Sequence, residues 1–186
     1  MNHCDPHART LFGFWLYLMT DCILFAVLFA TYFVLITGTA QGPSLKDLIH
    51  LPFIFIATWL LLTSSFTMAI AMLHSNIQRL IRWMIPTFLL GLAFLIMQGM
   101  EISRLIAMGS TWQKSAFLSA YHTLLATHAV HVLFGLLFMI IFLVQALWRG
   151  LTPVIWTRLS CLRLFWLFLD LVWIVTFTAI YLVGGS

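Results

Sequence analysis

The sequence predicts an all-α polytopic membrane protein whose five transmembrane helices pack as a helical bundle. Of its 186 residues, 63% are hydrophobic and only 8% are charged, whereas about a quarter of the residues in a soluble domain are charged. The apolar residues form long continuous runs and do not alternate with polar ones, as they would in the strands of a membrane barrel. Because lipid offers the backbone no hydrogen bonds, such runs must be helices. We expect residues 1–186 to form a single integral membrane domain.

Five apolar segments are each long enough to cross a bilayer, which takes about 20 helical residues. The fourth is the longest, so we expect it to tilt or to extend beyond the bilayer. Pro52 and Pro86 are expected near helix starts, where a missing N–H does little harm. The small residues Gly91, Ala93 and Gly99 would let the third helix approach its neighbours closely. The predicted spans are Leu11–Ile36, Leu51–Leu73, Trp83–Ile102, Ala116–Leu147 and Leu159–Val183.

The distribution of basic residues predicts the orientation in the membrane. The net charge is +4, but the basic residues are scattered between the spans and form no patch, so we expect no nucleic acid partner. Short cytoplasmic loops carry an excess of Lys and Arg. More basic residues fall on the side of the N-terminus, which predicts a cytoplasmic N-terminus and an external C-terminus. That side has Arg9, Arg79, Arg82, Arg149, Arg158 and Arg163, and the other side has Lys46, Arg104 and Lys114.

Two carboxylates, Asp21 and Asp170, fall near the middle of the first and fifth spans. An Asp at the membrane centre costs about 2.5–3.5 kcal/mol on insertion scales. The Leu, Ile, Val and Phe residues of the first span outweigh this cost, so each carboxyl should face protein and not lipid. The carboxyls could meet each other, or His128 or His131 at similar depth in the fourth span. Two roles remain open, namely hydrogen bonding that holds helices together and a step in a proton relay.

His128 and His131 are the residues most suited to bind a metal or a haem. Their i, i+3 spacing places them on one helix face, but a six-coordinate haem needs ligands on both sides of its plane. No other span supplies a deeply placed histidine, and the three cysteines include no Cys-x-x-Cys pair. We therefore expect packing or hydrogen bonding from both histidines, and no catalytic, cofactor-binding or metal-binding residue in this chain.

Glu101 and Arg104 lie three residues apart at the outer end of the third span, where we expect a local ion pair. Glu101 could alternatively reach His122, which should lie near the same membrane surface. An ion pair at the interface contributes little to stability, because water screens it.

Six segments of the sequence carry a family resemblance. They are LFGFWLYLMTDCILFAVLFATY (Leu11–Tyr32), GTAQGPSLKDLIHLPF (Gly38–Phe53), FLSA (Phe117–Ala120), THAVHV (Thr127–Val132), RGLT (Arg149–Thr152) and FWLFLDLVW (Phe165–Trp173). In this order they resemble subunit III of the bacterial cytochrome bo-type ubiquinol oxidases, which belong to the haem-copper oxidases. The resemblance covers nearly the whole chain. Five helices also match the quinol-oxidase version of this subunit, which lacks the first two helices of the seven-helix cytochrome c oxidase version.

The chain departs from the family pattern at three positions. Ala129 follows the first histidine of the T-H-x-x-H-V motif, where the family usually has Gly, and Leu167 replaces an expected His in the last helix. In the third helix the family has a Glu-x-x-Glu pattern, and Gln98 stands at the first Glu, whereas Glu101 matches the second. A role that depends on ionisation at Gln98 is therefore weakened. The other polar positions that match the family are Asp21, His128, His131 and Asp170.

The resemblance implies a non-catalytic role in a complex that oxidises ubiquinol, reduces oxygen to water and pumps protons. Haems, copper and proton channels would lie in subunit I, and this chain would support its stability and proton uptake beside subunits II and IV. Ubiquinol and oxygen would be met only through the complex, in a bacterial inner membrane. The resemblance also implies a cleft between the first two helices and the remaining ones that can hold phospholipid. We accordingly expect the bundle to divide into an N-terminal two-helix part and a three-helix part.

Two other functions compete with this interpretation. A small proton-coupled transporter could use Asp21 and Asp170, but such transporters have internal repeats or helices broken at the midplane, and the sequence shows neither. A membrane cytochrome is disfavoured by the placement of the histidines.

Overall fold

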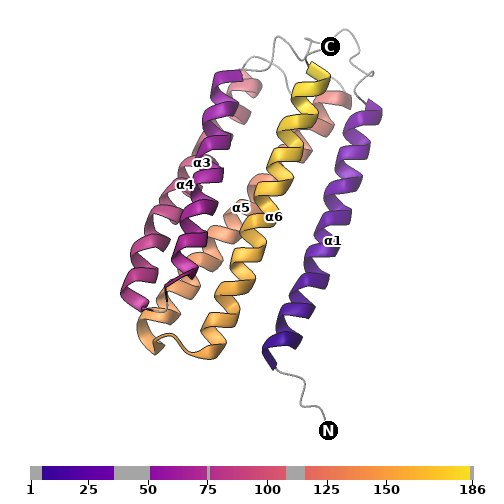
Figure 1. Ribbon diagram of the computed structural model, residues 1–186. Helices are drawn as coiled ribbons and strands as arrows, with labels where there is room; N and C mark the ends of the chain where they lie inside the picture. The colour runs from indigo at the N-terminus through magenta and orange to yellow at the C-terminus, as the bar shows by residue number, and fades with distance from the viewer. Residues whose placement is uncertain (1–5, 36–50, 75, 108–115, 185–186) are drawn as a thin grey trace.

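The computed structural model describes residues 6–35, 51–74, 76–107 and 116–184. Within these residues it has five helices long and apolar enough to cross a membrane, which confirms the predicted all-α polytopic fold (Figure 1). The motif stretch Gly38–His50 and the basic residues Lys46 and Lys114 lie outside the described residues. The helices are α1 (Pro6–Leu35), α3 (Leu51–Met72), α4 (Ile77–Ala107), α5 (Ala116–Arg149) and α6 (Pro153–Gly184).

The helices form a bundle in which α5 and α6 stand between α1 on one side and the pair of α3 and α4 on the other (Figure 1). Helix α3 packs on α4 and α6, and α1 packs on α5 and α6. The predicted grouping into an N-terminal two-helix part is therefore wrong, because α1 and α3 each pack mainly on later helices. Of the most apolar stretch of α1, 22% is buried inside the protein, against 56% for α6. Helix α6 is thus central, and α1 is peripheral.

Helix α4 begins before the span that hydropathy predicts. Its first residue is Ile77, six residues before the predicted start at Trp83. The side chain of Asn76 accepts a hydrogen bond from the backbone N–H of Gln78 at 3.0 Å, which satisfies one of the free donors at a helix start. Pro86 consequently lies inside α4, and the expectation that it lies near the helix start is wrong.

The turn between α5 and α6 is short and specified by its residues. Gly150 has φ of 70°, a left-handed conformation that only Gly adopts without cost, and its N–H donates to the carbonyl of Ala146 at 3.0 Å. This closes α5 with a glycine cap. Two residues later the Thr152 hydroxyl accepts from the N–H of Ile155 at 3.3 Å, and Pro153 occupies the first position of α6, which suits its fixed φ.

The centre of the bundle is the fully buried side chain of Trp166 on α6. It lies between Gly91 of α4 and Gly135 of α5, where an added Cβ would come within 2.8 Å and 2.9 Å of the indole ring. The indole N–H donates to the Ser64 hydroxyl of α3 at 3.1 Å. Gly91 therefore allows the close approach that the sequence predicts. Gly99 does not, because an added Cβ there would meet nothing within 4 Å.

Candidate functional site

Asp21 of α1 faces His131 of α5. Its carboxyl oxygen Oδ2 lies 3.9 Å from His131 Nε2, and Asp21 is 8% exposed. The other ring nitrogen, Nδ1, donates to the carbonyl of Thr127 at 2.8 Å, which fixes the ring on its own helix. Of the contacts left open by the sequence, the structure therefore pairs Asp21 with His131, and it directs this carboxyl toward protein.

His128 is fully buried one turn away and contacts a different helix. Its Nε2 donates to the carbonyl of Leu169 on α6 at 3.2 Å, because a carbonyl can only accept. The ring packs against Phe25, Phe94 and Trp173, with ring centroids 6.4 Å, 5.8 Å and 5.2 Å away. This side chain joins α1, α4, α5 and α6. Within the described residues no group of three or more His, Cys, Asp or Glu could hold a metal ion.

Asp170 of α6 is directed toward α3. It is 6% exposed, and the hydroxyl of Ser65 on α3 interacts with it. That hydroxyl and the Asp170 oxygen Oδ1 form no hydrogen bond of good geometry. Asp21 and Asp170 thus face different helices, α5 and α3.

Gln98 and Glu101 lie on the buried face of α4. The Gln98 amide donates to the carbonyl of Leu125 on α5 at 3.0 Å. Glu101 pairs with Arg104 at 3.4 Å, as the sequence predicts, but it is only 7% exposed and so is largely covered by other side chains. His122, the alternative partner, donates from Nδ1 to a carbonyl of its own helix at 2.8 Å.

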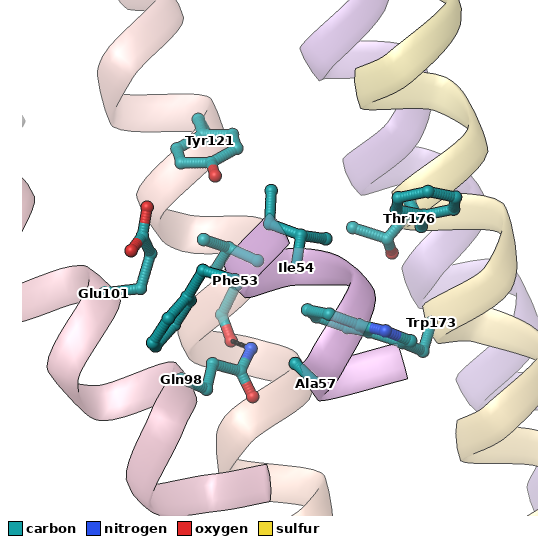
Figure 2. A pocket seen from close by; sticks show the side chains of 10 residues that line it. Phe53, Ile54, Ala57, Gln98, Glu101, Tyr121, Trp173 and Thr176 are labelled. Carbon is teal, nitrogen blue, oxygen red and sulfur yellow. Dashed lines mark hydrogen bonds between the residues drawn. The ribbon is translucent and has the colours of Figure 1, made fainter. Parts of the chain in front are cut away.

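A small internal cavity of about 30 Å³ adjoins Gln98 and Glu101. Figure 2 shows Glu101 and Tyr121 near one end of it and Gln98 nearer the other, with aromatic and aliphatic side chains between them. The space is large enough for about two waters, but its walls are mainly apolar. Its lining residues are Phe53, Ile54, Ala57, Gln98, Glu101, Tyr121, Leu125, Trp173, Thr176 and Phe177.

A much larger aromatic cleft, with about 610 Å³ of space, opens between α1, α5 and α6. His131 lines it, and so does Arg158, whose guanidinium donates to the Gln145 side chain at 2.8 Å. The sequence analysis missed this cleft, although the spacing of Phe134, Phe138 and Phe142 places three aromatic rings on one face of α5. The lining residues are Phe14, Tyr17, His131, Phe134, Phe138, Phe142, Arg158, Cys161, Leu162 and Phe165.

Hydroxyl groups between α3 and α4 form a second feature that the sequence analysis missed. The Ser64 hydroxyl donates to the carbonyl of Thr87 at 3.0 Å, and the hydroxyls of Thr67 and Thr87 are 2.8 Å apart. Ser64 also accepts from the indole of Trp166. Such hydroxyl contacts hold helices together in lipid. Their signal in the sequence is the presence of Ser and Thr inside an otherwise apolar span.

Two of the departures from the family pattern have clear surroundings. Leu167 is 43% exposed, so its apolar side chain lies on the outer surface of the bundle. Gln98 is 4% exposed, and its amide hydrogen bond to α5 needs no charge.

Comparison with known proteins identifies relatives along nearly the whole chain. The sequence model of the family described as cytochrome c oxidase subunit III matches residues 3–185. The cytochrome bo(3) ubiquinol oxidase subunit 3 of Pseudomonas aeruginosa is 51% identical over 184 residues, which cover 97% of this chain and 88% of the relative. The protein of the same name from Pseudomonas putida is 48% identical over 97% of this chain and 88% of its own length. The cytochrome c oxidase subunit 3 of Bacillus sp. PS3 is 40% identical over 92% of this chain and 84% of its own length.

Proposed function

The chain belongs to the cytochrome c oxidase subunit III family, and from this premise we propose that it is the non-catalytic subunit III of a proton-pumping, cytochrome bo-type ubiquinol oxidase. The observation that carries the proposal is its 51% identity, over 97% of the chain, to a relative named as subunit 3 of such an oxidase. It would assemble with subunits I, II and IV in an aerobic respiratory chain. Haems and copper would be held by subunit I, and ubiquinol and oxygen would be met only through the complex.

The six polar residues inside the membrane are proposed to support assembly and proton uptake by subunit I without carrying out chemistry. Each is buried or half-buried, and several contact a second helix through a hydrogen bond or a close polar contact. In lipid such contacts hold helices together, because an unpaired polar group there is costly. The residues are Asp21, Gln98, Glu101, His128, His131 and Asp170.

The aromatic cleft between α1, α5 and α6 is proposed to hold a phospholipid. Its walls are aromatic and aliphatic, which suits an acyl chain, and the guanidinium of Arg158 suits an anionic headgroup. This cleft is lined by α1, α5 and α6. It therefore does not lie between the first two helices and the last three, where the family resemblance would place it.

We propose a bacterial inner membrane, a single membrane domain over residues 1–186, and a cytoplasmic N-terminus. The start of α1, the end of α5 and the start of α6 lie at one end of the bundle (Figure 1). Arg9, Arg149 and Arg158 belong to that end, and the excess of basic residues there supports this orientation.

The proposed function is tested by purifying the tagged chain in a mild detergent. We expect a haem-containing subunit to co-purify, and the purified complex to oxidise ubiquinol. A colourless, monodisperse chain that transports a substrate in liposomes would instead support the proton-coupled transporter. A haem spectrum from the isolated chain would support the membrane cytochrome. The unbroken course of the five described helices argues against the transporter, whose helices are typically broken near the midplane.

Substitution of Asp170 separates a structural role from a proton relay. Asp170→Leu is expected to lower the yield or the thermal stability of the complex more than the turnover of each assembled complex, because the carboxyl is buried inside the bundle and faces α3. Spectroscopic haem content and oxygen consumption per haem measure the two quantities. Normal assembly with abolished turnover would show that the carboxyl relays protons.

Substitution of Glu101 is expected to have a mild effect. In Glu101→Gln the amide keeps the size of the side chain and an acceptor for Arg104, whose side chain is 28% exposed. The loss should be about 1 kcal/mol or less, because the amide keeps a hydrogen bond and only the charge of the carboxylate is removed from a pair whose Arg104 side is partly exposed. Thermal stability and proton uptake by the complex are the measurements, and a severe loss of proton uptake would contradict the structural role.

A further inference from the structure

One end of the bundle carries six exposed arginines. They come from four helices, α1, α4, α5 and α6, whose corresponding ends lie at the same end of the bundle in Figure 1. They are six of the nine basic residues in the chain, and each has the planar guanidinium that binds a phosphate through two parallel hydrogen bonds. This set, which we call the arginine rim, consists of Arg9, Arg79, Arg82, Arg149, Arg158 and Arg163.

The charge of the arginine rim is not paired inside the part of the chain that the structure describes. None of the six arginines forms an ion pair there, and Arg158 donates only to the neutral side chain of Gln145. Two acids of the sequence, Asp5 and Asp47, lie outside the described residues. The described acids are all buried, and they are Asp21, Glu101 and Asp170.

The arginine rim lies at the level where the apolar stretches of the helices begin. Arg82 directly precedes Trp83 and the apolar stretch of α4. Arg163 lies deeper, because it follows Arg158 by five residues, or about 7.5 Å along the helix, and has a leucine on each side. Side chains tilt toward the N-terminus of their helix, which directs Arg163 back toward the rim. At this level the anion within reach is the phosphate of a phospholipid, since an acidic protein in water stays above the headgroups.

We propose that the arginine rim binds anionic phospholipids of one leaflet through their phosphates and selects them over zwitterionic ones. Both classes carry a phosphate, but a zwitterionic headgroup adds an ammonium, which the arginines repel. A basic residue near a membrane surface favours anionic lipid about fivefold. The proposal goes beyond the role as subunit III, because it concerns this chain in any bilayer. The rim shares only Arg158 with the aromatic cleft.

Photocrosslinking in the assembled complex tests this selection. The complex is placed in bilayers of equal parts phosphatidylglycerol and phosphatidylethanolamine, and a trace of either lipid carries a diazirine next to its headgroup. Mass spectrometry then measures the crosslinks on peptides of this chain, and the ratio of glycerol lipid to ethanolamine lipid is compared between the two ends of α4. We expect a ratio several-fold above one at the start of α4. Near Arg104, whose charge is offset by Glu101, the ratio should be close to one.

Arg79→Gln together with Arg82→Gln should lower the ratio at the start of α4 several-fold, toward one. Arg104→Gln on the same helix is the matched control and should leave that ratio unchanged. Arg163→Gln tests the rim independently, because it should lower the ratio on peptides of α6. A ratio near one in the unsubstituted chain, or a ratio that these Gln substitutions in the rim do not lower, would overturn the proposal. Absence of lipid crosslinks at this end would also overturn it, because another subunit would then cover the rim.

Discussion

Replacing either glycine beside Trp166 by alanine is expected to destabilise the bundle strongly. A Cβ at Gly91 would lie 2.8 Å and 2.9 Å from two indole carbons, and one at Gly135 would lie 2.9 Å from a third. The indole cannot withdraw easily, because it is fully buried and bound to Ser64. Overpacking of this kind costs about 1–3 kcal/mol. Thermal denaturation of the purified complex, followed by the loss of this subunit, measures the effect.

Gly99→Ala on the same helix is the matched control. An added Cβ there meets nothing within 4 Å, and Ala favours a helix over Gly by about 1 kcal/mol, so stability should be unchanged or raised. The smaller side chain in Trp166→Leu should also reduce the penalty of Gly91→Ala. Equal effects of Gly91→Ala and Gly99→Ala, or no rescue by Trp166→Leu, would contradict the packing described for this site.

Trp166→Ala is expected to lower the stability of the complex by a similar or larger amount. The substitution leaves a void between two glycines and removes the indole N–H that donates to the Ser64 hydroxyl. Comparable truncations in soluble proteins cost about 3–5 kcal/mol, and part of that cost is the lost free energy of moving the side chain out of water. In a membrane protein the side chain moves out of lipid instead, so this part is smaller. We therefore expect a loss of roughly 2 kcal/mol or more here.

The yield of the assembled complex and its melting temperature measure this loss. Trp148→Ala is the control, because Trp148 is 85% exposed and its removal leaves no internal void. A melting temperature equally lowered by both substitutions would show that the central position of Trp166 does not matter.

The helices themselves could be predicted from the sequence, because hydropathy reports which segments can cross lipid. The predicted bounds of α3 agree with the structure within one residue. The starts of α1, α4 and α6 could not be predicted, since a helix continues into polar flanks until a cap ends it. Asn76 and Thr152 extend α4 and α6 beyond the apolar stretches, and Gly150 ends α5. Which helices pack against each other could also not be predicted from the sequence. Most of these spans are apolar on every face, so no pattern tells a protein-facing side from a lipid-facing one. Helix α4 is the exception, because its buried face carries Gln98 and Glu101.

The residues of the candidate site could be predicted one by one, but their contacts with each other could not. Burial of Asp21 and Asp170 follows from the cost of charge in lipid, whereas the choice of partner depends on the rotation of each helix. His128 and His131 lie one turn apart on α5, and the sequence alone does not say which of them meets Asp21. The aromatic cleft was missed for the same reason, because its walls come from three helices whose neighbours are set only by the fold.

The position of α1 has a consequence for biogenesis. Its packing partners, α5 and α6, are the last two helices to leave the ribosome. Until they are inserted, Asp21 has no His131 beside it and must wait in the bilayer unpaired. The two final helices, joined by a turn of only a few residues, can enter as a hairpin and then capture the first one. A nascent chain that stops after α4 would therefore keep the Asp21 carboxyl in the membrane without its partner. Such an unpaired carboxyl would allow quality control to recognise the incomplete chain.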